Sequence, residues 1–187
     1  MINIYARLAV FGLMVASVSA CQTIDTMLVK NVGETESSKL NALIFCAGTE
    51  QCEFERFNKT QIVNALNHRL NPEAIQQGIV RLQSKSLNDP NPLSLSVPAG
   101  QHELVIRFYP VSPDRAETLH VFHNFGAQKS YTFKMYRNRI KHAGNLLDVS
   151  APDPLCVELQ QEQKTIRRFC KPYNVLNGLG EFVERKI

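Results

Sequence analysis

Alternating apolar and polar residues mark the middle third of the chain. Leucine and valine alternate with serine over residues 93–97, and apolar side chains recur at every second position over 104–108. A turn rich in proline and glycine, at 98–101, separates the two runs. Together they predict a β-hairpin with one buried face.

The same pattern recurs twice further along the chain. Residues 119–125 and 131–136 flank a turn at 126–129 and predict a second hairpin, which a loop over 110–117 joins to the first. Residues 157–160 and 166–169 predict a third. Strands at this spacing favour a mainly β (α+β) fold: an antiparallel β-sandwich or a curled sheet with one or two short helices, rather than a parallel α/β fold.

The region before these strands mixes strand and helix patterns. A short apolar run at 42–45 predicts a buried strand, and the chain leaves the following turn through 53–54. Residues 60–70 have apolar positions spaced for one helix face, so we expect a helix there. The segment 71–78 begins with asparagine, proline and glutamate and ends in glycine, which predicts a second, short helix. Residues 79–82 are expected to form a strand.

The N-terminus has the pattern of an export signal. One side-chain positive charge, on Arg7, precedes an apolar run over 8–18 and small residues at 19 and 20. The run is well short of the roughly 20 residues that cross a bilayer as a helix. We therefore expect residues 1–20 to be a cleaved signal peptide.

The residues Val18, Ser19, Ala20 and Cys21 resemble the lipobox of bacterial lipoproteins. This resemblance implies diacylglycerol on the Cys21 thiol, cleavage after Ala20 and usually a fatty-acyl chain on the new amino group. Gln22 in place of aspartate implies sorting to the outer membrane. The alternative is an ordinary secretory signal that leaves Cys21 as a thiol of the mature chain.

The domain organisation follows from this leader. We expect residues 21–40 to form a lipidated tether and residues 41–187 a periplasmic β-rich domain. Apolar residues in the tether, among them Val29 and Val32, have partly helical spacing. Part of the tether is therefore expected to dock on the domain.

Four further cysteines remain: Cys46, Cys52, Cys156 and Cys170. An even number in an exported chain predicts two disulfides. Of the three connectivities we favour the two local pairs, because each pair brackets a polar turn. Neither pair has the C-x(2-4)-C spacing of zinc sites.

Two segments at 97–104 and 126–133 are similar to a pattern in PEGA-like envelope β-domains, in which a proline–glycine turn leads into a "G-x-H" strand and a later strand begins near a lysine and a tyrosine. The resemblance implies an exported, non-enzymatic β-sandwich. It names no ligand.

Neither the charge of the chain nor its sequence motifs indicate a specific activity. The net charge is +4, and the sequence contains no polybasic tail, which argues against nucleic-acid binding. Neither a nucleophile elbow nor a phosphate-binding loop is present. His120 and His123 are the only close histidine pair, but residues three apart on a strand point to opposite faces. His102 is expected to stabilise the turn beside it. No cofactor is expected.

Two basic clusters could form one anion-binding patch if folding joins them. One contains Arg137, Arg139 and Lys141; the other contains Arg167 and Arg168. The alternative is solvated charge that keeps edge strands from pairing.

The sequence therefore predicts an outer-membrane lipoprotein, anchored by lipid and facing the periplasm. Its non-catalytic β-domain would bind or scaffold another envelope component, whether protein, lipid or glycan. The alternatives are a lipid-anchored envelope hydrolase and a surface-exposed lipoprotein.

Overall fold

The computed structural model of the 187-residue chain describes residues 27–84, 87, 89–139, 153–171 and 180–187. The expected signal peptide, Cys21 and Lys141 lie outside the described residues. Within the described part of the chain, no helix is long and apolar enough to traverse a bilayer.

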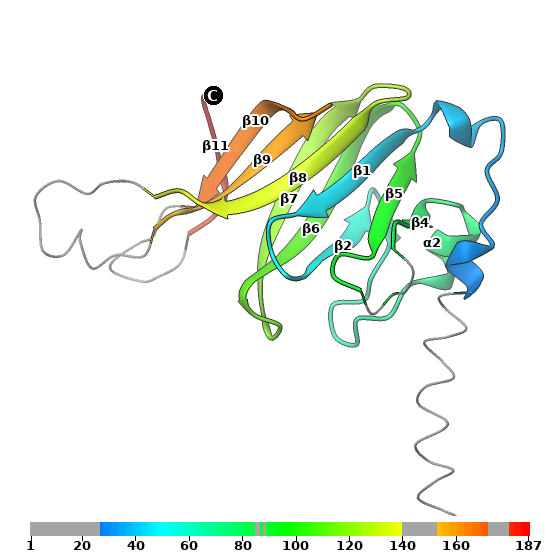
Figure 1. The fold of residues 1–187 in the computed structure, drawn as a ribbon, viewed down its shortest axis with the longest axis horizontal. Helices are drawn as coiled ribbons and strands as arrows, with labels where there is room; N and C mark the ends of the chain where they lie inside the picture. Colours follow the sequence, from blue (N-terminus) through cyan, green and yellow to red (C-terminus); the bar gives the residue numbers. More distant parts are fainter. Residues whose placement is uncertain (1–26, 85–86, 88, 140–152, 172–179) are drawn as a thin grey trace, which may run out of the picture.

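Two β-sheets pack face to face, which confirms the predicted mainly β sandwich (Figure 1). We call the seven-stranded sheet, with order β11-β10-β9-β8-β1-β5-β4, sheet A, and the four-stranded sheet, with order β3-β2-β6-β7, sheet B. The strands of sheet A are β1 (Ala42–Ala47), β4 (Val80–Leu82), β5 (Leu93–Val97), β8 (Ser130–Arg137), β9 (Leu155–Gln161), β10 (Lys164–Lys171) and β11 (Val183–Arg185). Those of sheet B are β2 (Cys52–Phe57), β3 (Thr60–Gln61), β6 (Gly100–Ser112) and β7 (Arg115–Phe125). All described pairings are antiparallel except β1 with β8, which is parallel.

The core lies between the sheets and is built from the apolar positions of the alternating strands. Fully buried aromatic rings come from both layers, with Phe54 and Phe108 in sheet B and Phe133 in sheet A. Burial of such large apolar side chains supplies the main driving force for folding.

The first two predicted hairpins are wrong, although their strands exist. β5 pairs with β1 and β4 in sheet A, and the turn after it carries the chain across to β6 in sheet B. β7 and β8 likewise belong to different sheets. The alternation of apolar and polar residues shows which face of a strand is buried, but it does not show which strand pairs with it. Strands of both sheets in a sandwich have this alternation, so it cannot assign a strand to one sheet.

The observed hairpin of sheet B is β6 with β7, whose register runs from Gly100 opposite Phe125 to Ser112 opposite Arg115. The expected loop at 110–117 is therefore mostly strand, with only residues 113–114 between the two elements. β5 also differs from the prediction, because Ser94 and Ser96 are buried along with its apolar residues.

The third predicted hairpin is confirmed as β9 and β10. Its turn residues Glu162 and Gln163 both have positive φ, of 48° and 70°, as expected for a two-residue hairpin turn. Cys156 faces Cys170 in this register, and the two form the predicted disulfide.

The helix expected at 60–70 is wrong. The segment contains the short strand β3 and a turn closed by a bridge between Val63 and Leu70, and Leu66 is 94% exposed. The side chain of Asn64 accepts the backbone N–H groups of Leu66 and Asn67. Asparagine favours such local turns over a helix.

The second helix is confirmed as α2 (Pro72–Gln76), and its Asn71 cap accepts the N–H of Glu73. The chain passes Gly78, whose φ is 68°, and then forms β4, as expected.

The chain before β1 contributes to the fold. Residues 27–30 are helical, Val29 is 2% exposed and belongs to the core, and Val32 packs against it. This confirms the docking expected for part of the tether. The folded body begins at or before Val29, ahead of the boundary expected at 41.

Candidate functional site: the open end of the sandwich

The loop between β1 and β2 crosses from one sheet to the other at one end of the sandwich. β1 ends at Ala47 in sheet A, β2 begins at Cys52 in sheet B, and a disulfide joins Cys46 to Cys52 with a Cα–Cα distance of 6.2 Å. The predicted local pairing of all four cysteines is thus confirmed. We call residues 47–51 the crossing loop.

The crossing loop rests directly on β8. Gly48 has a φ of 94°, which glycine adopts without strain. A Cβ on Gly48 would overlap the carbonyl oxygen of Met135 and lie 2.8 Å from its nitrogen. Any other residue would push the loop off the strand, so Gly48 fixes the floor of this end.

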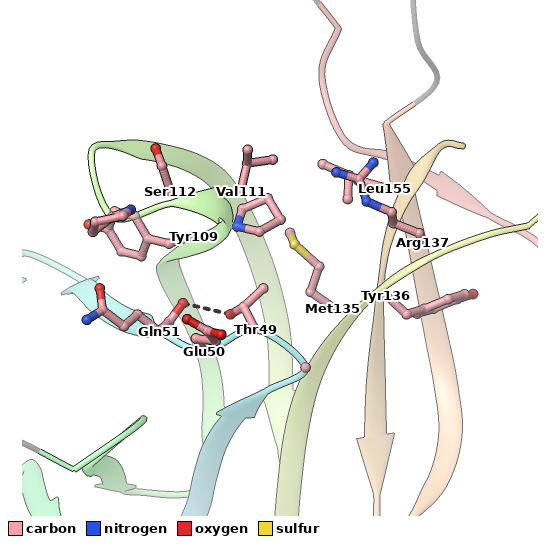
Figure 2. Close-up of a pocket in the computed structure, with 13 residues that line it drawn as sticks. Thr49, Glu50, Gln51, Tyr109, Val111, Ser112, Met135, Tyr136, Arg137 and Leu155 are labelled. Atoms are coloured by element: carbon pink, nitrogen blue, oxygen red, sulfur yellow. Dashed lines mark hydrogen bonds between the residues drawn. The ribbon is translucent and has the colours of Figure 1, made fainter. Parts of the chain in front are cut away.

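A cleft of about 430 Å³ opens above the crossing loop (Figure 2). We call it the mouth cleft. Its lining comes from three segments: residues 48–51 of the crossing loop, residues 109–113 of β6 and the turn after it, and the strand ends at residues 135–137 and 155. Its volume falls within the range of small-ligand and side-chain pockets.

The mouth cleft is lined by both polar and apolar side chains. Figure 2 shows Met135 extending toward the segment that carries Val111, while Arg137 lies beside Leu155 and Tyr136 turns away. Val111 is 74% exposed although it sits at the end of a long strand. Glu50 and Arg137 are both exposed, and no ion pair engages either of them within the described residues. The cleft therefore offers apolar contacts flanked by one free charge of each sign.

A second, larger hollow of about 1010 Å³ adjoins the mouth cleft and shares Glu50, Gln51 and Pro113 with it. Glu53 of β2 lies in its wall and accepts hydrogen bonds from Arg107 and from the hydroxyl of Tyr109, both at 2.8 Å. His68 places Nδ1 at 2.8 Å from the other oxygen of Glu53. Three side chains thus converge on one carboxylate.

This carboxylate cluster is well ordered by its surroundings. Arg107 is buried, with Glu55 a second carboxylate at 3.4 Å. Burial, and next the hydrogen bond to Glu53, raise the pKa of Tyr109 far above its usual range, so the phenol stays a donor at physiological pH. His68 has a positive φ of 54°. Glu53, at 2.8 Å from Nδ1, orients the imidazole beside the hollow.

The expected anion-binding patch is not joined into one surface. Arg167 pairs with Glu184 at 2.7 Å and also donates to the carbonyl of Phe122, whereas Arg168 pairs with Glu158 at 3.0 Å. Neighbouring residues of a strand point to opposite faces. The two arginines therefore lie on opposite faces of sheet A, each with a carboxylate partner.

The other members of the expected patch have separate surroundings. Arg137 lines the mouth cleft, Arg139 is exposed beyond the end of β8, and Lys141 lies outside the described residues. Lys171, from the same hairpin as Arg167, pairs with Glu117 of β7 at 2.6 Å. Charges on β10 therefore connect sheet A to the edge strand of sheet B.

The histidines behave as the strand pattern predicted. His120 is exposed, whereas His123 lies on the inner face, against the rings of Phe125 and Tyr131. His102 holds its turn through the carbonyl of Pro98, at 3.0 Å. Within the described residues, no group of three or more potential metal-ligating side chains comes together.

The sequence indicated some residues of the open end but not that folding brings them together. Gly48 and the cysteines carried a local signal, since a short loop bounded by cysteines predicts a disulfide. Glu53, His68, Arg107 and Tyr109 carried none, because β2, β6 and the 64–70 turn are distant in sequence. Comparison with known proteins found no matching protein-family model, curated protein or solved structure.

Proposed function

We propose that the chain is an outer-membrane lipoprotein whose β-sandwich binds or scaffolds another component of the cell envelope through the mouth cleft. The observation that carries the binding role is the exposed apolar side chain of Val111 above the buried Met135, between the free charges of Glu50 and Arg137. A concave site that combines apolar contacts with a few charged groups is typical of binding sites. The role is non-catalytic.

The placement rests on the N-terminal residues. An apolar run followed by Val18, Ser19, Ala20 and Cys21 supports export and lipidation. Two disulfides fit an oxidising compartment such as the periplasm. Several acyl chains on one residue give lasting anchorage, because each buried methylene contributes about 0.8 kcal/mol.

The anchor is tested by fractionation of cells that produce the Cys21→Ser chain. The unaltered chain is expected in the outer membrane, with the mass of one diacylglyceryl group and one acyl group added to its first residue by mass spectrometry. The variant is expected to lose these lipids and to leave the outer-membrane fraction. An unaltered chain that starts with unmodified Cys21 and stays in the soluble fraction would refute the lipoprotein assignment.

Binding at the mouth cleft is tested by photo-crosslinking in living cells. A photoreactive amino acid replaces Val111 in the lipidated chain, and a matched control places it at Val183 of β11, which is also an exposed valine. We expect a discrete cross-linked product from position 111 and none of the same mass from position 183. Equal labelling from both positions, or none from 111, would contradict a binding role for the cleft.

A second function is favoured by the Glu53–His68 pair. A histidine oriented by a carboxylate beside a hollow can serve as a general base for hydrolysis, which fits the alternative of a lipid-anchored envelope hydrolase. The described walls of the hollow contain no serine, and their one cysteine, Cys52, is in a disulfide, so water would have to be the nucleophile. Hydrolysis of chromogenic ester or glycoside substrates that is lost in His68→Gln would favour this function.

A further inference from the structure

The end of β1 leaves part of β8 without a neighbour. β1 and β8 pair in parallel from Leu43 opposite Ser130 to Ala47 opposite Lys134. β8 then continues to Arg137 and pairs on its other side with β9, as far as Leu155. The crossing loop has by then turned toward sheet B, so β8 extends past its parallel partner at the mouth cleft.

The backbone of Arg137 points toward this vacated side. The carbonyl of Ser130 accepts the N–H of Glu162, and the N–H of Asn138 donates to Pro154, so even-numbered residues of β8 face β9. The carbonyl of Lys129 accepts the N–H of Leu43 of β1, so the backbone N–H and C=O groups of odd-numbered residues of β8 point toward β1. The N–H and C=O of Arg137 therefore face the place where β1 would be if it were longer, and within the described residues no strand pairs with them there.

The side chains around this open edge supply complementary chemistry. Met135 and Val111 both line the cleft, one from each sheet, and Val111 is exposed to an incoming aliphatic side chain (Figure 2). Arg137 offers a cation without an ion-pair partner in the described structure. The arginines of β6 and β10, in contrast, are all paired with carboxylates.

The edge is held in place rather than adaptable. Gly48 packs against the backbone of Met135, and the disulfide from Cys46 to Cys52 ties the crossing loop to both sheets. Both contacts hold the loop at the level of Met135, before Arg137. A preformed edge lowers the conformational cost of binding.

We propose that the mouth cleft takes an extended peptide segment of a partner protein, which adds to sheet A beside β8 in the place that β1 vacates. One aliphatic side chain of the peptide packs against the exposed Val111, and an acidic side chain or carboxyl terminus meets Arg137. Strand addition of this kind draws affinity from main-chain hydrogen bonds and specificity from alternate side chains. The inference rests on the proposed function and names the class of its partner.

The test uses a phage-displayed library of random short peptides, selected on the full lipidated chain in detergent. Selection in parallel uses Arg137→Glu, and the matched control is Arg139→Glu, which makes the same charge change outside the cleft lining. We expect enriched peptides with aliphatic residues at alternate positions and an acidic group at one end. Their affinity should fall at least about tenfold in Arg137→Glu and stay unchanged in Arg139→Glu, and lysine in place of the peptide's acid should restore binding to Arg137→Glu.

Main-chain pairing is tested separately with synthetic versions of the enriched peptide. N-methylation of the amides on one edge of the peptide should abolish binding, while N-methylation on the other edge should be tolerated, because only one edge of the added strand faces β8. Equal tolerance of both would overturn strand addition, as would equal binding to the two charge variants, enrichment only of unpatterned apolar peptides, or no enrichment. A cross-link from Val111 in cells combined with any of these outcomes would refute the peptide inference alone and leave the proposed binding role intact. Self-association of the purified chain that Val111→Asp abolishes would instead identify a second copy as the occupant.

Discussion

Cys46 and Cys52 are six positions apart in the sequence, yet their disulfide joins strand β1 of sheet A to strand β2 of sheet B. The bond therefore fixes the point at which the two layers meet. β1 ends one residue after Cys46, whereas β8 continues past it to Arg137. A local covalent link thus sets the geometry of the mouth cleft.

Removal of this disulfide should affect stability and the cleft together. Replacing Cys46 and Cys52 by serine should lower the free energy of unfolding by about 2 kcal/mol, as expected for a small closed loop. The same change at Cys156 and Cys170 should cost about 3 kcal/mol for the longer loop. Urea unfolding measures both.

Only the first of these double variants should also weaken cross-linking from position 111, because only that disulfide holds the crossing loop. Equal loss of cross-linking in the two variants at matched stability would contradict a specific role for Cys46 and Cys52.

Gly48 should tolerate no side chain. Gly48→Ala places a methyl group against the Met135 backbone and forces a positive φ on alanine. The expected loss is about 2 kcal/mol or more in the free energy of unfolding. Gly33→Ala is the control, since a Cβ there meets nothing within 4 Å, and it should change stability by less than about 0.5 kcal/mol. Similar values for the two variants would show that the close contact of Gly48 with β8 is not required.

The segment before β1 should contribute to stability at one position and not at its neighbour. Val29→Ala removes two buried carbon atoms and should cost about 1.5 kcal/mol. Leu28→Ala changes an exposed residue on the same turn and should cost little. Thermal unfolding of both variants measures the difference. Equal effects would place Val29 in a free tether instead of the core.

His123 should make the fold less stable in mild acid. Burial, and next the charge of Arg167, lower the pKa of His123, and its Nε2 is buried without a hydrogen-bond partner in the described structure. In the unfolded chain His123 is protonated as the pH falls through about 6.5. In the folded chain the lowered pKa keeps it neutral at that pH. The stabilising contribution is therefore present above that pH and is lost as the pH falls below it.

The measurement is urea unfolding at several values between about pH 7 and pH 5. His123→Gln should flatten the decline in stability across this range, while His120→Gln, an exposed position on the same strand, should retain the decline of the unaltered chain. An unchanged slope in His123→Gln would assign the pH dependence to other groups.

Residue patterns predicted the strands far better than their partners. The alternation at 93–97 and 104–108 located β5 and β6 correctly, but it could not show that the turn between them leads from one sheet to the other. The hairpin β9–β10 was predictable because its partners are adjacent and its cysteines fix the register. The apolar spacing at 60–70 was misleading, since Asn64 closes a turn that the periodicity did not reveal.

The candidate site was less predictable than the fold. The sequence marks Arg137 only by its charge, whereas its proposed role follows from the early end of β1, which only the sheet order shows. Arg167 and Arg168 are adjacent in the sequence, but adjacent strand residues point to opposite faces, and each has a carboxylate partner. Glu53 gains its three donors from segments that the chain brings together only after folding.

The most direct test of the account is the yield of cross-linked product from Val111 in the lipidated chain, measured in living cells with and without Arg137→Glu. We predict one product of defined mass from position 111 that the charge reversal strongly reduces, with no such product from Val183. A product from both positions, or none from 111, would contradict the claim that the open end of the sandwich is the binding surface, and a yield from 111 that is indifferent to Arg137 would contradict the peptide inference.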